Sequence, residues 1–309
     1  MKGPLFYSKI LLFGEYGIIK DSKGLSIPYN FYNGALKSDE NPSESAKKSN
    51  GCLARFADYL EGLDSKLVKF DIIALKADIE NGMYFDSSIP QGYGVGSSGA
   101  LVAAIYDKYA FDKITVLENL TREKLLSLKG IFSEMESFFH GKSSGLDPLN
   151  SYLSIPILIN SKDNIEATGI PAQQSNGKGA VFLLDSGVVG ETAPMVSLFM
   201  ENMKQKGFRS MLKNQFIKLT DSCVDDFLKG DIKSLFHNTK QLSKVVLNHF
   251  KPMIPIQFHE IWKKGLDTND YYLKLCGSGG GGYILGFTED ITKAKESLKD
   301  YKLEVVYNF

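Results

Sequence analysis

The stretch PQGYGVGSSGALVA, residues 90–103, limits the fold most, because it places flexible residues directly before a helix-forming run. Glycines at positions 92, 94 and 96 allow positive φ angles and a close approach of a ligand to the backbone. Ser97 and Ser98 then fall at the start of the predicted helix, where free N–H groups and the helix dipole favour an anion. The pattern is neither a P-loop nor a GxGxxG motif after a strand. By itself it leaves two interpretations open, a tight turn with a serine N-cap or a phosphate-binding loop.

The composition is that of a globular protein without a strong charge bias. The chain has 309 residues, 43% of them hydrophobic, and its 36 basic residues balance 36 acidic ones. This balance argues against nucleic-acid or membrane-surface binding through bulk charge, so anion binding must come from local geometry. The three cysteines form no metal-binding pattern, and Glu15 breaks the N-terminal apolar run too early for a signal peptide. No apolar stretch approaches the roughly 20 residues of a membrane span. We therefore expect a cytoplasmic protein.

The hydrophobic patterns predict an α+β protein, with strands in the first third and helices in the middle. We expect helices at residues 52–63, 98–109 and 121–141, with Thr121 as an N-cap, and several more between 194 and 264. The polar segment 38–51 is expected to be a loop, and the Gly-rich segment 171–179 suggests domains of residues 1–170 and 171–309. Strands are expected at 6–13, 26–37, 70–79, 83–90, 151–160, 179–187, 271–276, 283–287 and 303–309, with one more helix near 290–299.

Two further segments accompany the Gly-rich loop. KILLFGEYG, residues 9–17, places Lys9 on a predicted strand that ends in Gly14-Glu15, and KLCGSGGGGYI, residues 274–284, places a second Gly-rich loop between strands. In chain order the three segments resemble the motifs of the GHMP kinase superfamily. These motifs are Lys-x-x-Leu-x-Gly-Glu, then Pro-x-x-x-Gly-Leu-Gly-Ser-Ser, with Val95 at the leucine position here, and then Gly-x-Gly-Gly-Gly-Gly. Three motifs in the family order are far more specific than one Gly-rich loop.

The resemblance implies the two-domain fold of these kinases. The N-terminal domain would resemble ribosomal protein S5 domain 2, the C-terminal domain would be a ferredoxin-like α/β sandwich, and the active site would lie in the cleft between them. The resemblance also implies the cofactors ATP and Mg²⁺ and a small-molecule acceptor. It implies no nucleic-acid or membrane partner, and it leaves a homodimer open.

Within the superfamily, the segment HGKSSGLD, residues 140–147, resembles mevalonate kinases. Glu136 stands where those enzymes carry a magnesium-binding glutamate. Leu11 and Ile18 stand where galactokinases carry Asn and Asp, so sugar kinases are disfavoured. Tyr16 replaces the histidine that is usual in mevalonate kinases, and a Glu-Tyr pair at this point is closer to bacterial phosphomevalonate kinases. This departure leaves the identity of the acceptor open, whereas phosphoryl transfer is expected with either acceptor.

In the family mechanism, the residues at these positions divide phosphoryl transfer among them. Asp147 would take the proton of the acceptor hydroxyl, while Lys9 would stabilise the charge that develops. The Ser98 hydroxyl and the Glu136 carboxylate would hold magnesium. The nucleotide-binding residues would be Gly92, Gly94, Val95, Gly96, Ser97, Ser98 and Gly99. Supporting roles would fall to Glu15, which would pair with a cation or cap an amide, and to Ser144, Gly277, Ser278 and Gly279.

Several of these residues also have a purely structural interpretation. Asp147 precedes a proline and could only form a turn. Glu134 competes with Glu136 for the magnesium role, from a different face of the helix. Ser144 could cap a turn instead of contacting a phosphate. His140 follows two phenylalanines and is expected to be structural.

The leading hypothesis is an ATP-dependent phosphotransferase that converts mevalonate to 5-phosphomevalonate in isoprenoid biosynthesis. Phosphomevalonate kinase is the alternative; its acceptor already carries a phosphate and needs more cations. The chain has only three arginines, which mildly favours mevalonate, although lysine also binds phosphate. A catalytically inactive nucleotide-binding regulator is less expected, because Lys9, Ser98, Glu136 and Asp147 are all present. The segment HGKSSGLD also argues against the related decarboxylase.

Overall fold

Interleaved segments make up the two compact units of the computed structural model, which describes residues 4–39, 41–115 and 120–309. Unit 1 consists of Met1–Lys9, Ile27–Pro90 and Gly96–Ile155. Unit 2 consists of Ile10–Ser26, Gln91–Val95 and Pro156–Phe309. The division into contiguous domains of residues 1–170 and 171–309 stays a prediction. The compact units differ from it in that residues 10–26 and 91–95 belong to unit 2.

The first sheet contains two long strands that contribute residues to both units. Its order is β1 (Phe6–Phe13), β2 (Gly24–Ser38), β4 (Ile157–Ser161) and β5 (Asn164–Ala167), and β3 (Met83–Ser87) also pairs with β2. In unit 1, the end of β2 pairs antiparallel with β3. In unit 2, the first residues of β2 pair antiparallel with β4, which pairs with β5. β1 thereby carries Lys9 in unit 1 and leads directly into the segment that holds Glu15 in unit 2.

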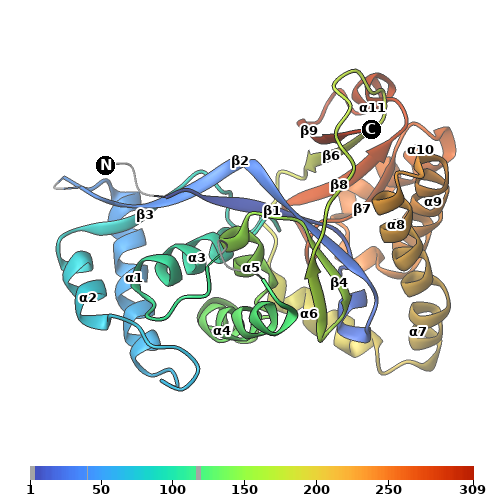
Figure 1. Ribbon diagram of the computed structural model, residues 1–309. Coiled ribbons are helices and arrows are strands. Elements are labelled where there is room, and N and C mark those ends of the chain that lie inside the picture. The colour runs from blue at the N-terminus through green and yellow to red at the C-terminus, as the bar shows by residue number, and fades with distance from the viewer. Residues whose placement is uncertain (1–3, 40, 116–119) are drawn as a thin grey trace. The chain divides into compact units, whose positions relative to one another are not determined.

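The helices of unit 1 lie on one side of β2 and β3 (Figure 1). α3 (Ser97–Tyr109) is buried along most of its length and packs against α5 (Leu146–Leu153) and α4 (Arg122–His140). Tyr106 on α3, Phe132 on α4 and Tyr152 on α5 meet edge to face at centroid distances of 5.0–5.6 Å. This aromatic core fixes the three helices that carry Ser98, Glu136 and Asp147. The helices are α1 (Glu44–Glu61), α2 (Ile72–Glu80), α3 (Ser97–Tyr109), α4 (Arg122–His140) and α5 (Leu146–Leu153).

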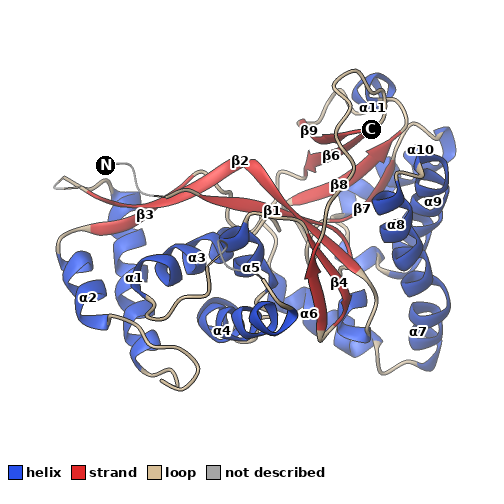
Figure 2. Cartoon of the chain, in the orientation of Figure 1, coloured by secondary structure: helices blue, strands red, loops and turns tan. Residues whose placement is uncertain are grey.

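The second sheet lies wholly in unit 2 and is antiparallel (Figure 2). Its order is β7 (Tyr272–Leu275), β8 (Tyr283–Thr288), β6 (Ala180–Asp185) and β9 (Leu303–Asn308). With helices between β6 and β7 and between β8 and β9, this order is the ferredoxin-like arrangement, as predicted. The helices are α6 (Thr192–Asn202), α7 (Lys206–Met211), α8 (Ile217–Lys229), α9 (Ile232–His249), α10 (His259–Thr268) and α11 (Ile291–Ser297), with a π-helical turn at Leu212–Phe216 and 3₁₀ turns at Gly17–Lys20, Lys251–Met253 and Ile256–Phe258.

The predicted α+β class is confirmed, and Thr121 is the N-cap of α4, where it accepts a hydrogen bond from Lys124 N at 3.4 Å. Within the described ranges, no helix combines the length and the apolar character needed to cross a membrane.

The strand predicted at residues 70–79 is wrong, because this segment forms α2. Asp71 caps the helix by accepting a hydrogen bond from Ala74 N at 2.9 Å. Leu75 and Ile79, four residues apart, are buried, whereas Ile73 is exposed. The apolar run suggested a strand, but the N-cap and the four-residue spacing produce a helix.

Two other boundaries also differ from the predictions. The loop expected at 38–51 contains the first turns of α1, which begins at Glu44 after the N-cap Ser43, whose side chain accepts from Ala46 N at 3.2 Å. The strand expected at 151–160 begins only at Ile157, because α5 continues to Leu153. The start of α1 is polar and α5 is short, so neither shows the apolar periodicity that would have predicted a helix there. The short strand β5 was not predicted.

We predict that Gly286→Ala destabilises unit 2. Gly286 on β8 lies opposite Phe182 on β6, and an added Cβ would lie 2.7 Å or less from three ring carbons of Phe182. Overpacking of this kind costs about 1–3 kcal/mol.

The control is Gly207→Ala in α7, where a Cβ would meet no atom within 4 Å. The helix former alanine should stabilise that site by roughly 0.5–1 kcal/mol. Chemical denaturation of both variants measures the difference, and equal stabilities would contradict the prediction.

Candidate functional site

A lysine and an aspartate from distant parts of the chain meet in unit 1. Lys9 on β1 is only 4% exposed, and its Nζ lies 3.0 Å from Oδ1 of Asp147 in the first turn of α5. The side chain of Asp147 stays 36% exposed, so the carboxylate remains accessible to a ligand. An unpaired buried ammonium group would be strongly unfavourable, and the attraction to the aspartate offsets part of that cost.

Glycines bring Asp147 to this position. Gly145 adopts a φ of +72° as the residue before α5, which no larger side chain adopts easily. At Gly99 in α3, an added Cβ would lie 2.7 Å from the backbone carbon of Asp147, so α3 and α5 cross closely there. At Gly96 an added Cβ would lie 3.0 Å from Cγ of Lys9 and 3.7 Å from Oδ2 of Asp147. The end of the Gly-rich loop therefore lies directly against the Lys9–Asp147 pair.

Helix α3 begins at this loop without a side-chain cap. Gly96 is its N-cap, with a φ of +84° and no side chain that could accept a hydrogen bond from the first turn. Ser97 and Ser98 are the first two residues of the helix, as predicted. The N-terminus of α3 thus offers backbone N–H groups and the positive end of a helix dipole to an anion.

The Ser98 hydroxyl belongs to a hydrogen-bonded cluster around a buried carboxylate. Ser98 Oγ donates to Glu136 Oε1 at 2.9 Å and lies 3.0 Å from His140 Nε2. Ser143 donates to the other oxygen of Glu136, which is only 3% exposed. Burial, followed by the negative charge of Asp147, raises the pKa of Glu136 to about 7. A carboxylate in this situation is stabilised by a bound cation.

The donor set fits a magnesium ion that takes most of its ligands from phosphate and water. Mg²⁺ in nucleotide sites is bound by one or two carboxylates and substrate phosphates rather than by an all-protein cage. In the described ranges, no group of three or more His, Cys, Asp or Glu side chains is arranged to hold a metal. Ser98 and Glu136 are the residues that would contact the ion.

Two of the open alternatives can be compared with the geometry. Glu134 is exposed to solvent, whereas Glu136 is buried beside Ser98, so only Glu136 belongs to the cluster. Ser144 accepts a hydrogen bond from Leu146 N at 3.4 Å, the contact of a turn cap. His140 was expected to be structural, and its Nε2 lies 3.0 Å from Ser98 Oγ.

The remaining predicted residues lie in unit 2, where two Gly-rich segments pack on each other. At Gly94 an added Cβ would lie 2.8 Å from the carbonyl oxygen of Cys276, and at Gly277 it would lie 3.2 Å from Cα of Gly94. Tyr283 N donates to Tyr93 O at 3.3 Å. Residues 91–95, which continue covalently into Gly96, are therefore supported by the segment 276–283. Gly92 is held from another side, because Gly190 N donates to its carbonyl at 2.9 Å.

Glu15 pairs with a cation, as the sequence suggested, and the cation is Lys274. Lys274 Nζ lies 2.5 Å from Glu15 Oε1, and the two side chains are 4% and 5% exposed. The ammonium group also donates to Leu275 O at 2.9 Å and lies 5.8 Å from the ring centroid of Phe13. This buried pair ties the end of β1 to β7, the strand before the second Gly-rich loop.

Sequence reasoning gave no role to Ser143, Lys274 or the segment 188–190. A signal existed for Lys274, since it begins the KLCGSGGGG motif, and for Ser143, since it lies within HGKSSGLD. The segment 188–190 has no sequence signal, because its hydrogen bonds to the two loops are made by backbone atoms of Val188 and Gly190.

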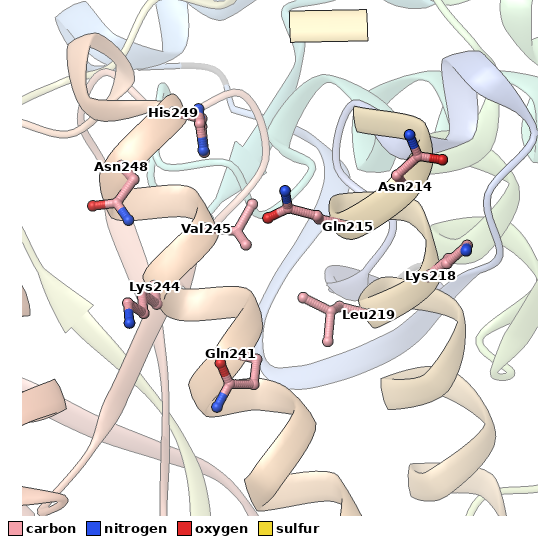
Figure 3. Close-up of a pocket in the computed structure, with 9 residues that line it drawn as sticks. All are labelled: Asn214, Gln215, Lys218, Leu219, Gln241, Lys244, Val245, Asn248 and His249. Carbon is pink, nitrogen blue, oxygen red and sulfur yellow. The ribbon is translucent and has the colours of Figure 1, made fainter. Parts of the chain in front are cut away.

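A groove of about 440 Å³ lies elsewhere in unit 2, between the π-helical turn with α8 and the end of α9 (Figure 3). Asn214, Gln215 and Lys218 face it from one helix, and Gln241, Lys244 and Asn248 from the other. These residues are exposed and recur at helical spacing. They form the solvated faces of two amphipathic helices, and none of the predicted site residues lines the groove.

Part of the chain is similar to a known protein family. Residues 53–154 match the family model described as the GHMP kinases N terminal domain. Over this segment the chain is similar to the N-terminal domain of GHMP kinases. The segment contains Gly96, Ser98, Glu136 and Asp147, and the resemblance stated from the sequence motifs is confirmed over this range. A search by sequence among curated proteins finds no match.

Solved GHMP kinase structures share the fold along the whole chain. L. major mevalonate kinase in complex with R-mevalonate is 17% identical with a TM-score of 0.64, over 100% of this chain and 99% of that one. Streptococcus pneumoniae phosphomevalonate kinase with phosphomevalonate and AMPPNP is 14% identical with a TM-score of 0.64, over 100% and 99%. Lactococcus lactis galactokinase with galactose is 12% identical with a TM-score of 0.62, over 98% and 92%. At these identities the likeness establishes the fold and leaves the acceptor open.

We predict that Lys274→Met strongly destabilises unit 2. The change leaves Glu15 buried without its cation, and breaking one side of a buried pair costs about 3–5 kcal/mol. The matched control is Lys23→Met, because Lys23 pairs with Asp225 at the same 2.5 Å distance but with 31% and 40% of the side chains exposed. An exposed pair contributes about 0–1 kcal/mol. Urea unfolding of both variants tests the difference, and a similar small loss in each would refute the structural role of the buried pair.

Proposed function

We propose that the protein is an ATP-dependent kinase that phosphorylates a hydroxyl group of a small molecule, with mevalonate as the preferred acceptor. The observation that carries the proposal is the Lys9–Asp147 pair beside Gly96, at the uncapped N-terminus of α3. Phosphoryl transfer to an alcohol requires a proton acceptor, a cation and an anion-binding site next to one another in space, and these three features meet here.

In the proposed mechanism, backbone N–H groups of the Gly-rich loop bind the terminal phosphates of ATP. Asp147 accepts the proton of the acceptor hydroxyl as that oxygen attacks the γ-phosphorus, while the bond from the γ-phosphorus to the oxygen that bridges it to the β-phosphate breaks and ADP leaves. Lys9, already beside Asp147, stabilises the negative charge on the attacking oxygen and on the transferred group. The role of the protein is mainly positioning and charge stabilisation, since the reaction needs little covalent chemistry from the enzyme.

Magnesium would bind at Ser98 and Glu136, where it would neutralise phosphate charge. Ser143 and His140 orient this pair through their contacts with Glu136 and Ser98. Glu15 and Lys274 act at a distance, by fixing the end of β1 and the start of the second Gly-rich loop.

The choice of mevalonate as acceptor is supported by the segment HGKSSGLD, by Leu11 and Ile18 in place of the galactokinase residues, and by the low number of arginines. Phosphomevalonate kinase is the second candidate, and Tyr16 is the specific observation that favours it, because Glu-Tyr resembles the phosphomevalonate kinase motif. Similarity to both kinds of solved enzyme is compatible with either acceptor.

A coupled assay of ADP release tests the acceptor. Purified protein with ATP and Mg²⁺ is offered mevalonate, phosphomevalonate, homoserine or galactose in turn. We expect turnover with mevalonate and at most slow release with the others. Turnover with phosphomevalonate alone would assign the second candidate. An absence of ADP release above background with all four would reject the proposed acceptor class.

We predict that Asp147→Asn removes most turnover while nucleotide affinity stays close to that of the wild type. The amide keeps the shape of the side chain but cannot accept the proton, and a general base contributes about 10²–10⁴ in rate. Asp86→Asn is the matched control. Asp86 also pairs with a lysine in unit 1, since its Oδ2 lies 2.5 Å from Lys37 Nζ, but neither residue has a predicted catalytic role. Near-normal turnover in Asp147→Asn would reject Asp147 as the base.

A further inference from the structure

Tyr16 occupies an unusual position in unit 2, immediately after Glu15. Its φ of +59° is a left-handed conformation that residues other than glycine rarely adopt. The ring is buried and stacks on Phe199 at a centroid distance of 4.7 Å, with Phe250 at 6.0 Å. Surrounding packing therefore holds both the backbone and the ring in one arrangement, and such enforced strain is common at functional positions.

The hydroxyl group of Tyr16 is directed at the second Gly-rich loop. It donates a hydrogen bond of 2.6 Å to the carbonyl oxygen of Ser278. Burial, with the charge of Glu15 second, raises the pKa of Tyr16 well above its usual range, so the hydroxyl keeps its proton. Because the bond joins residues 262 positions apart, it fixes a loop from outside the loop's own sequence.

The loop needs such an anchor. Gly277, Gly279, Gly280, Gly281 and Gly282 all have positive φ angles, and a run of glycines has little intrinsic preference for one conformation. The loop nevertheless packs tightly on the segment 91–95, with the carbonyl of Cys276 and Cα of Gly94 at the contact. At Gly282 an added Cβ would meet the backbone of Tyr93 at less than 3.0 Å. A displaced loop would therefore release the first half of the predicted nucleotide-binding segment.

We propose that Tyr16 is a positioning residue for the nucleotide: its hydroxyl, bonded to Ser278 O, holds the loop 277–282 against residues 91–95. This inference rests on the proposed nucleotide site. Glu15 and Tyr16 then act as a pair, since consecutive side chains bind the strand before the loop and the loop itself. The tyrosine found where mevalonate kinases usually carry histidine thus has a structural partner in this chain.

Tyr16→Phe tests the proposal, because it removes only the hydroxyl and keeps the stacked ring. The net value of such a bond, about 0.5–1.5 kcal/mol, corresponds to roughly a 2- to 10-fold loss of nucleotide affinity. We expect that loss for AMPPNP in calorimetry, with kcat at saturating ATP close to that of the wild type. We also expect faster hydrogen exchange at the amides of residues 276–283.

Tyr307→Phe is the matched control. Tyr307 lies on β9 in the same unit, is buried, and donates an equally long bond of 2.6 Å to Pro171 O. It should lose comparable stability but keep both nucleotide affinity and loop exchange unchanged. Exchange rates and affinity equal to wild type in Tyr16→Phe, or the same changes in both variants, would overturn the inference. Absence of AMPPNP binding by the wild-type protein would instead refute the proposed function, and the exchange comparison would still test whether Tyr16 holds the loop.

Discussion

The contact between Lys9 and Asp147 is the interaction on which the functional interpretation depends. The two residues are 138 positions apart and approach to 3.0 Å only because β1, α3 and α5 pack as they do in unit 1. Gly96 and Gly99 lie against the pair, and a side chain at either position would push the Gly-rich loop or α5 away. The same small residues that we propose let the backbone bind an anion therefore also let Lys9 and Asp147 come together.

A second, independent constraint acts in unit 2. The buried pair of Glu15 and Lys274, the hydroxyl of Tyr16 and the glycines of both loops form one support for residues 91–95. The Gly-rich segment is thus held at its first half by unit 2, while its second half becomes the start of α3 in unit 1. In each unit, short contacts join residues that are far apart in the sequence: Lys9 with Asp147 in unit 1, and Glu15 with Lys274 in unit 2.

Much of this arrangement was predictable from the sequence, and the reasons differ between residues. The first two motifs gave Lys9 and Ser98, and the segment HGKSSGLD gave Asp147, because these combinations of glycines with a lysine, a serine or an aspartate are specific in sequence. Periodicity failed for α2, where Asp71 as an N-cap outweighed an apolar run that suggested a strand. Lys274 escaped notice as the partner of Glu15, because a buried ion pair depends on tertiary packing. His140 was judged by its aromatic neighbours, although its ring contacts Ser98.

The most direct test of the central claim is the identity of the phosphorylated product. Phosphorus NMR of a reaction with ATP, Mg²⁺ and mevalonate should show a new phosphate monoester and ADP forming together with the wild-type protein. With Lys9→Met the monoester should be absent at equal protein concentration, because the developing charge loses its cation. Equal product formation by the two proteins would contradict the account of Lys9 and Asp147 as the centre of the reaction.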